Sequence, residues 1–249
     1  MKNFQKKEII LTIIGLLLSI ATINAQTDKE TEIYKLYDKI VGKDNLDSNN
    51  GVLYINPYET LGDNHHIYFS EDKFEKGTLY YNGQIYFETS LKYDSYRDIL
   101  ILNPDGGSEL IGISLNKEKV EAFSLYDRKF VKLNKEQSAL LNLTTGYYEI
   151  YENNNDFILY IKHTKAIQKR VKEDGIYYEF KPQNSYLLYY MKTLYAVNSK
   201  SDILKIFPNQ KKQINEFYLM NREIRKSDKN EFMKNLMKYI NNSLPNKNK

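Results

Sequence analysis

The chain of 249 residues contains no cysteine and only three histidines. Without cysteine it forms neither disulfides nor thiolate metal sites, and it has no thiol nucleophile. A bacterial lipoprotein needs a cysteine directly after its leader for acylation, so the sequence excludes that class. The net charge of +4 is too weak to indicate nucleic acid as the main partner, because nucleic-acid binders usually concentrate basic residues on one face.

Familiar catalytic motifs are also missing. The sequence contains no Gly-x-Ser-x-Gly nucleophile elbow, no His-Glu-x-x-His zinc motif and no phosphate-binding loop. We therefore predict no catalytic residue from a motif, and we expect neither a cofactor nor a metal ion.

The first 25 residues have the three parts of a cleavable secretory signal peptide. The basic start consists of Lys2, Lys6 and Lys7. An apolar run over 9–21 follows, and Ala25 stands before the expected cut, which leaves Gln26 first. The run of about 13 residues is shorter than the roughly 20 that a spanning helix needs. We therefore predict a periplasmic or secreted protein that is not an integral membrane protein; an uncleaved anchor is the alternative.

The chain is expected to have three parts. These are a signal peptide over 1–25, an antiparallel β domain with a leading helix over 26–200, and a helical segment packed on it over 201–249. The leading helix is predicted over 27–41, because Thr27 and Glu30 fit a capping box ahead of an apolar stripe at helical spacing.

Residues 52–198 show short aromatic and β-branched runs separated by turn residues. Asn82-Gly83 between two such runs is typical of a two-residue hairpin turn, because both positions need a positive φ. The apolar run 99–102 predicts a strand buried on both sides. No long helical pattern separates the strands, which argues against a parallel α/β sheet. We predict a mainly β fold with a single antiparallel β-meander, as a partly open barrel or a sandwich, one N-terminal helix and two or three C-terminal helices.

The end of the chain is predicted to be helical over 201–207, 209–221 and 228–241. Asp228 and Glu231 form the capping box of the last helix. Lysine and arginine outnumber acids after residue 211, so a peripheral contact of these basic helices with an anionic membrane is one hypothesis. A solvated outer face is the alternative.

The 23 tyrosines are the most unusual feature of the composition. Exposed tyrosine can stack on sugars or anchor a protein partner with little loss of entropy. The candidate binding residues are Tyr81, Tyr86, Tyr93, Tyr148 and Tyr178. Adjacent tyrosines on a strand point to opposite faces, so tyrosines that serve the core are the alternative.

Carboxylates and histidines offer two further candidate sites. Asp94 and Asp98 flank a turn before the strand at 99–102, where they could act as an acid–base pair or simply cap the turn. His65 and His66 could ligate a metal, but consecutive strand residues point apart, and we expect a solvated loop there.

Several segments resemble a group of exported bacterial β-rich proteins of unknown function. The segments are 77–86 (GTLYYNGQIY), 91–94 (LKYD), 98–101 (DILI) and 201–207 (SDILKIF). The resemblance spans most of the mature chain and implies export and a single domain. It implies no catalytic residues.

The sequence favours an exported, non-enzymatic protein that binds a protein or cell-envelope partner through an aromatic sheet face. Two alternatives remain open: a lipid- or glycan-binding open barrel, and a hydrolase with carboxylates at Asp94 and Asp98.

Overall fold

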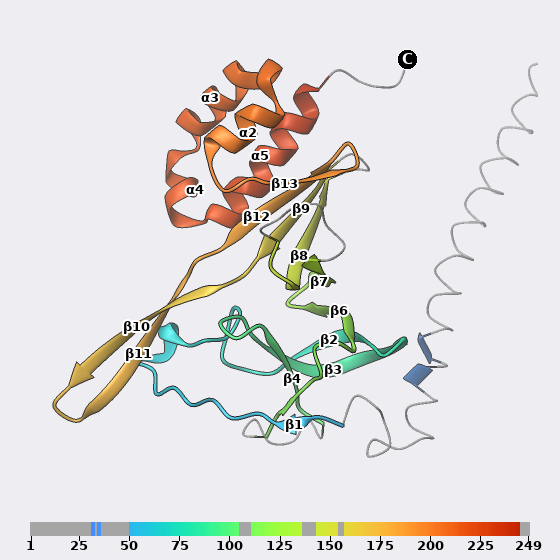
Figure 1. Cartoon of the computed structure of the whole chain (residues 1–249), viewed down its shortest axis with the longest axis vertical. Helices are drawn as coiled ribbons and strands as arrows, with labels where there is room; N and C mark the ends of the chain where they lie inside the picture. Colours follow the sequence, from blue (N-terminus) through green and yellow to red (C-terminus); the bar gives the residue numbers. More distant parts are fainter. Residues whose placement is uncertain are drawn as a thin grey trace, which may run out of the picture.

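The computed structural model describes residues 31–32, 34–35, 50–104, 111–135, 143–153 and 157–244. These residues form thirteen strands and four α-helices, and eleven of the strands make one antiparallel sheet that is not closed (Figure 1). The prediction of a mainly β, antiparallel fold is confirmed. The predicted N-terminal helix at 27–41 lies mostly outside the described residues.

The main sheet is a meander in which most neighbouring strands also follow each other along the chain. Its order is β1-β5-β4-β3-β2-β6-β7-β8-β9-β12-β13. These strands are β1 (Val52–Leu53), β2 (Glu75–Tyr81), β3 (Gln84–Asp94), β4 (Ile99–Leu102), β5 (Ile113–Ser114), β6 (Val120–Leu125), β7 (Arg128–Leu133), β8 (Gly146–Asn153), β9 (Phe157–Lys162), β12 (Ser185–Tyr190) and β13 (Thr193–Ala196). The other two strands, β10 (Lys165–Lys172) and β11 (Gly175–Pro182), pair with each other and form what we call the arm.

Two-residue turns with positive φ at both positions connect three of the hairpins. Asn82-Gly83 joins β2 to β3 with φ values of 53° and 75°, as the sequence predicted. Tyr126-Asp127 and Met191-Lys192 make the same kind of turn with positive φ at both positions. Neither Tyr126 nor Asp127 is a glycine, so the sequence carries no marker of the left-handed conformation at this turn.

Aromatic rings form the core of the N-terminal half of the sheet. Phe123 on β6 and Phe130 on β7 stack with centroids 4.6 Å apart, and Tyr93 on β3 meets both of them edge-on. Strand β4 is buried except for the partly exposed Ile99, close to the prediction for the apolar run 99–102. Because burying apolar surface is the main driving force of folding, these rings stabilise this half of the molecule.

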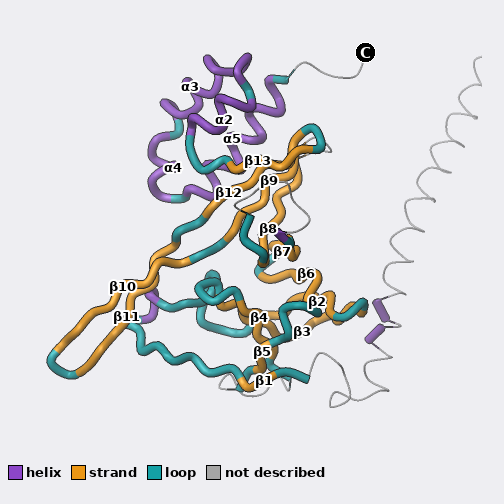
Figure 2. The backbone as a smooth tube through the Cα atoms, viewed as in Figure 1, coloured by secondary structure: helices purple, strands orange, loops and turns teal. Residues whose placement is uncertain are grey.

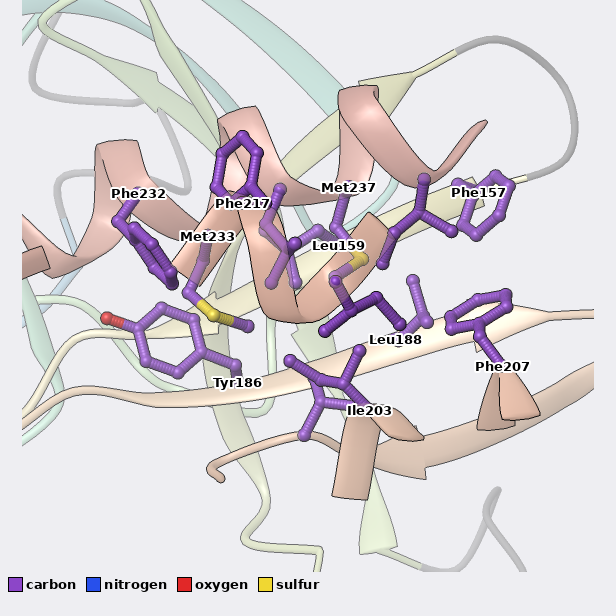
Figure 3. Packing of buried hydrophobic residues seen from close by; sticks show 14 of the residues in the cluster. Phe157, Leu159, Tyr186, Leu188, Ile203, Phe207, Phe217, Phe232, Met233 and Met237 are labelled. Carbon is purple, nitrogen blue, oxygen red and sulfur yellow. The ribbon is translucent and has the colours of Figure 1, made fainter. Parts of the chain in front are cut away.

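Four helices cover the C-terminal strands. They are α2 (Lys200–Ile206), α3 (Lys211–Met220), α4 (Arg222–Ser227) and α5 (Lys229–Ser243). Their apolar side chains share a core with β9 and β12 (Figure 3). The predicted start of α5 is confirmed, since the Asp228 side chain accepts a hydrogen bond from the Glu231 amide at 2.9 Å. The first helix, in contrast, is capped by Ser199 together with Asp202, slightly before the predicted start at Ser201.

The arm continues β9 and β12 beyond the sheet. Strand β9 pairs with β12 as far as Lys162 and Ser185, and the pairing resumes between Lys165 and Pro182 in the arm. Figure 2 shows this ribbon extending away from the sheet and the helices. At the middle of the arm, Thr60 forms a parallel bridge with Tyr178 on β11, so the segment before β2 runs beside the arm.

A mostly buried ionic cluster around Asp98 joins the β3–β4 turn to the start of β8. The carboxylate accepts hydrogen bonds from Tyr93 Oη (2.6 Å), Lys162 Nζ (2.6 Å) and Lys117 Nζ (2.5 Å). Burial alone would raise the pKa of Asp98, but these donors lower it. Gly146, the first residue of β8, lies against the cluster: a Cβ there would overlap the Asp98 carboxylate and the Lys162 ammonium.

We expect Gly146→Ala to destabilise the protein by about 2–4 kcal/mol, because the added methyl group must push apart a buried ion pair. Urea unfolding monitored by tyrosine fluorescence measures the change. The matched control is Gly175→Ala, whose Cβ would meet only the Tyr177 ring at ordinary contact distances. If both substitutions changed the free energy of unfolding by the same small amount, the absence of a side chain at Gly146 would not be required for stability.

Candidate anion-binding site

A cavity of about 720 Å³ lies where the sheet, the base of the arm and the junction of α4 and α5 meet; we call it the cleft. Strand ends and loops contribute most of its wall, and residues 226–230 close one side. Its lining is largely polar and includes His66, Ser95, His163, Thr164, Asn184 and Asn230.

The wall of the cleft carries an excess of positive charge. Among the described residues, the cationic side chains that line it are Arg128, Lys165, Lys226 and Lys229, and the one carboxylate is Asp228. The Asp228 carboxylate accepts a hydrogen bond from the first turn of α5. The N-terminal end of this 15-residue helix adds the positive end of its dipole to the same wall. The cleft therefore suits a negatively charged group.

A buried carboxylate lies behind the cleft. Glu149 on β8 has a side chain only 2% exposed, and it bonds with His163 Nε2 (2.6 Å). Lys234 Nζ on α5 (2.6 Å) and Arg128 Nη1 on β7 (3.2 Å) also donate to it. An unpaired buried charge costs free energy, so the positions of these donors and of Glu149 depend on one another. The orientation of His163 and Arg128 at the cleft wall is therefore set by Glu149.

The ionisation of this cluster follows from its contacts. Burial alone would raise the pKa of Glu149, but the hydrogen bonds from His163 and Lys234 lower it to about 2. Burial lowers the pKa of His163, and the contact with Glu149 opposes this only in part. At neutral pH Glu149 is thus ionised, and His163 is neutral with its proton on Nε2. Nδ1 of His163 is then a hydrogen-bond acceptor.

Lys165, the first residue of β10, is a half-buried cation of the cleft. Its Nζ donates to the carbonyl oxygen of His66 at 2.5 Å. None of the ion pairs formed within the described residues includes Lys165. Burial lowers the pKa of Lys165 to about 8, so at pH 7 it still carries its charge. That charge faces the cleft without a carboxylate bonded to it in the described part of the chain.

The two adjacent histidines do not behave as expected. His66 is buried and lines the cleft, and its Nδ1 accepts a hydrogen bond from the Tyr68 amide at 3.2 Å. The expectation of a solvated loop is therefore wrong for His66, because the chain folds it against the arm. In the part of the chain that the structure describes, no group of three or more histidine and carboxylate side chains is arranged to hold a metal ion.

The tyrosines predicted as a binding face lie mostly in the interior. Tyr81, Tyr86, Tyr93 and Tyr148 are 1%, 3%, 0% and 3% exposed. Tyr178 is half-buried and packs at the middle of the arm. A surface that meets a partner cannot consist of buried rings, so these positions support the alternative in which the tyrosines serve the core.

The carboxylates predicted as a hydrolase pair have separate partners. Asp94 is held by Arg97 Nε (2.6 Å) and Tyr54 Oη (3.0 Å), whereas Asp98 belongs to the cluster near β8. The Asp94 carboxylate also accepts the Arg97 amide at 2.8 Å, which is the local capping role given as the alternative. Neither carboxylate lines the cleft or the smaller cavity of about 340 Å³ beside Lys92.

The smaller cavity has aromatic walls that already contact the chain's own cations. Lys92 Nζ lies 4.5 Å from the ring centroid of Tyr68 and 4.6 Å from that of Phe74. The Arg97 guanidinium lies 4.7 Å from the Tyr54 centroid. One face of each ring is therefore occupied, which makes this cavity a weaker candidate for stacking a sugar.

Sequence reasoning missed Glu149 and Lys165. Glu149 lies two residues from both Tyr147 and Tyr151, so the three side chains point to the same face of the strand. The two tyrosine rings pack in the two main cores. A charged residue at such an inward-facing position was therefore a usable signal. Lys165 carried no such signal, because it lies in a run of lysines and polar residues whose burial depends on how the arm meets the sheet.

Comparisons with known protein families, curated proteins and solved structures found no match. Among the helices of the described residues, none combines the length and the apolar character of a membrane span. The cleft is therefore the feature from which a function is inferred.

The Glu149 cluster predicts a specific dependence of stability on pH. The pKa of Glu149 in the folded protein, about 2, lies below its ordinary value of 4.5. The stability that its ionised form contributes is therefore fully present above about pH 5 and is lost as pH falls toward 2. The shift corresponds to a contribution on the order of 3 kcal/mol at neutral pH. Glu149→Gln should therefore be markedly less stable than the parent protein at pH 7, and the gap should shrink at pH 3.

Urea unfolding of both proteins at the two pH values measures this gap. Glu216→Gln, an exposed substitution on α3, is the control and should show no comparable gap. If the free energies of unfolding of Glu149→Gln and the parent protein differed equally at pH 7 and pH 3, the prediction that Glu149 is ionised would be wrong.

Proposed function

We propose that this chain is a binding protein that holds an anionic group of its ligand in the cleft. The observation that carries the proposal is the half-buried Lys165, which lines the cleft and has no carboxylate bonded to it within the described chain. Keeping a charge in such a place costs free energy unless a partner compensates it. An anionic ligand would supply that compensation.

The surroundings of Lys165 suit a carboxylate or phosphate group. Lys229 lines the same cleft at the start of α5, and Asn184 and Asn230 supply amide groups that can donate hydrogen bonds. Arg128 is partly neutralised by Glu149 and contributes less. A group with several oxygen atoms could accept hydrogen bonds from more than one of these donors at once.

Two other functions have less support. A lipid-binding site needs a predominantly apolar cavity, whereas cations and amides line the cleft. A hydrolase that used His163 as its base would need a nucleophile beside it, but the hydrogen bond of the His163 ring is made to Glu149. The hydroxyl of Ser95, another lining residue, donates to the carbonyl of Ile67.

Export is part of the proposal. The leader expected over 1–25 supports a mature protein in the periplasm or outside the cell. The ligand would then be an anionic group on a protein or a cell-envelope component. The cleft takes the place of the aromatic sheet face as the contact surface, because most of the tyrosines expected on that face are buried.

We expect phosphate to stabilise the protein through Lys165. At pH 7, sodium phosphate at about ten times its dissociation constant should raise the melting temperature by about 3–6 °C over sodium chloride of equal ionic strength. Lys165→Met should abolish the rise, while the control Lys169→Met, on the exposed part of the same strand, should keep it. The rise should also fall between pH 7 and pH 9, since the pKa of Lys165 is about 8. Equal rises in both variants would contradict the site.

Expression of the full chain in a bacterium tests export. The mass of the accumulated protein should correspond to a chain that begins at Gln26, and Ala25→Asp should prevent the cut because the position before it requires a small residue. Protein that retains residues 1–25 in the cytoplasmic fraction would contradict this part of the proposal, and it would leave the phosphate experiment unaffected.

A further inference from the structure

The outer edge of β10 is a long exposed strand edge. Every residue from Ala166 to Lys172 is exposed, and among the strands that the structure describes β10 pairs only with β11. No backbone hydrogen bond reaches β10 from its outer side within the described residues. Such an edge is a template on which another extended chain can pair.

The register of the arm shows which backbone groups point outward. Antiparallel partners alternate between pairs that bond to each other and pairs whose N–H and C=O groups point away. The Gln183 amide donates to the Thr164 carbonyl at 2.8 Å, and the next pair contains Pro182, which has no N–H. Thr164 and Gln183 therefore bond to each other, and the backbone groups of the next pair point away from the partner strand. Because this pattern repeats every two residues, the outward N–H and C=O groups of β10 belong to Lys165, Ile167, Lys169 and Val171.

The opposite edge of the arm shows this rule at work. Tyr178 pairs with Lys169 and therefore should also point outward. Its amide donates to the Glu59 carbonyl at 2.9 Å, and its carbonyl accepts the Leu61 amide at 3.1 Å. The chain thus already adds a short parallel strand to the β11 edge, which shows that the arm has the geometry for strand addition.

The side chains of β10 define what kind of strand fits. One face carries the exposed apolar residues Ile167 (40%) and Val171 (74%), with Ile176 (46%) opposite Val171 on β11. Lys165 and Lys169 lie on the same face as these apolar residues. Lys172 lies on the other face together with Arg170, which forms an ion pair with Glu179 at 3.1 Å. An added strand that combines apolar side chains with acidic ones would complement the apolar residues and the lysines.

A second copy of this chain fits the same edge poorly. Antiparallel pairing of two copies of β10 would bring together two strands that are both basic, each with Lys165, Lys169 and Lys172. Repulsion between these like charges opposes such a pairing. The charge of the strand therefore favours an acidic partner over self-association.

We propose that the outer edge of β10 accepts an extended, acidic segment of a partner protein as an additional strand of the arm. The segment bonds through the outward groups at Ile167, Lys169 and Val171. This surface is separate from the binding of a small anion in the cleft, although Lys165 stands at the border of both.

The test uses the full mature chain and a fluorescent eight-residue peptide that alternates Glu and Val. Fluorescence anisotropy at low salt should show saturable binding, and amide hydrogen exchange should slow at Ile167, Lys169 and Val171. A peptide with Lys in place of Glu should not bind. A third peptide keeps every side chain of the first but carries an N-methyl group on every backbone amide; it should also fail, because neither of its edges can donate hydrogen bonds to β10.

Two substitutions at one outward position provide the matched pair. Lys169→Pro removes an outward N–H but no bond between β10 and β11, so it should weaken binding about tenfold or more. Lys169→Ala removes only the charge and should weaken binding less. The peptide series decides the outcome even if the proline variant folds poorly.

Three results would overturn the proposal. These are equal binding of the N-methylated peptide, exchange protection confined to the cleft, and binding of the arm to phosphatidylserine vesicles with no binding of the Glu–Val peptide. The phosphate-induced rise in melting temperature, which depends on Lys165, would survive each of these results, so failure of the arm proposal is distinguishable from failure of the cleft.

Discussion

The buried carboxylate of Glu149 joins the three parts of the fold. It lies on β8, reaches α5 through Lys234, and meets the base of the arm through His163. A buried charge is tolerated only when such partners surround it, so the sheet, the helices and the arm must take positions that satisfy it. The cleft is the space between these parts. Its shape and its positive wall therefore depend on the same ionic contacts.

A second ionic anchor restrains the open sheet. Large twisted sheets tend to curl or to split, and this sheet is not closed by strand pairing. Asp98 holds the β3–β4 turn against β8 and β9 through Lys162, while an aromatic core fills the space beneath. Because the chain has no cysteine, no disulfide stabilises its fold, and stability depends on these buried ionic clusters and packed cores.

The two proposed binding surfaces meet at Lys165. Its ammonium group lines the cleft, and its backbone begins the strand whose outer edge is exposed. A segment that pairs along β10 would therefore run to or from the mouth of the cleft, where an acidic group could reach the same lysine. The arm and the cleft suit one extended acidic ligand as well as two separate ones, because both present cations to it.

Local structure was largely determined by the sequence. The Asn82-Gly83 turn, the apolar strand at β4 and the Asp228 cap depend on neighbours in the chain, and each lies where the pattern predicted it. The site was decided by tertiary structure. Glu149, His163 and Lys234 are brought together from distant positions, and the burial of Lys165 and of the tyrosines depends on which strands curl over them. Charge compensation and ring burial act between residues far apart in sequence, so a local pattern can mark an inward-facing charge such as Glu149 but does not identify its partners.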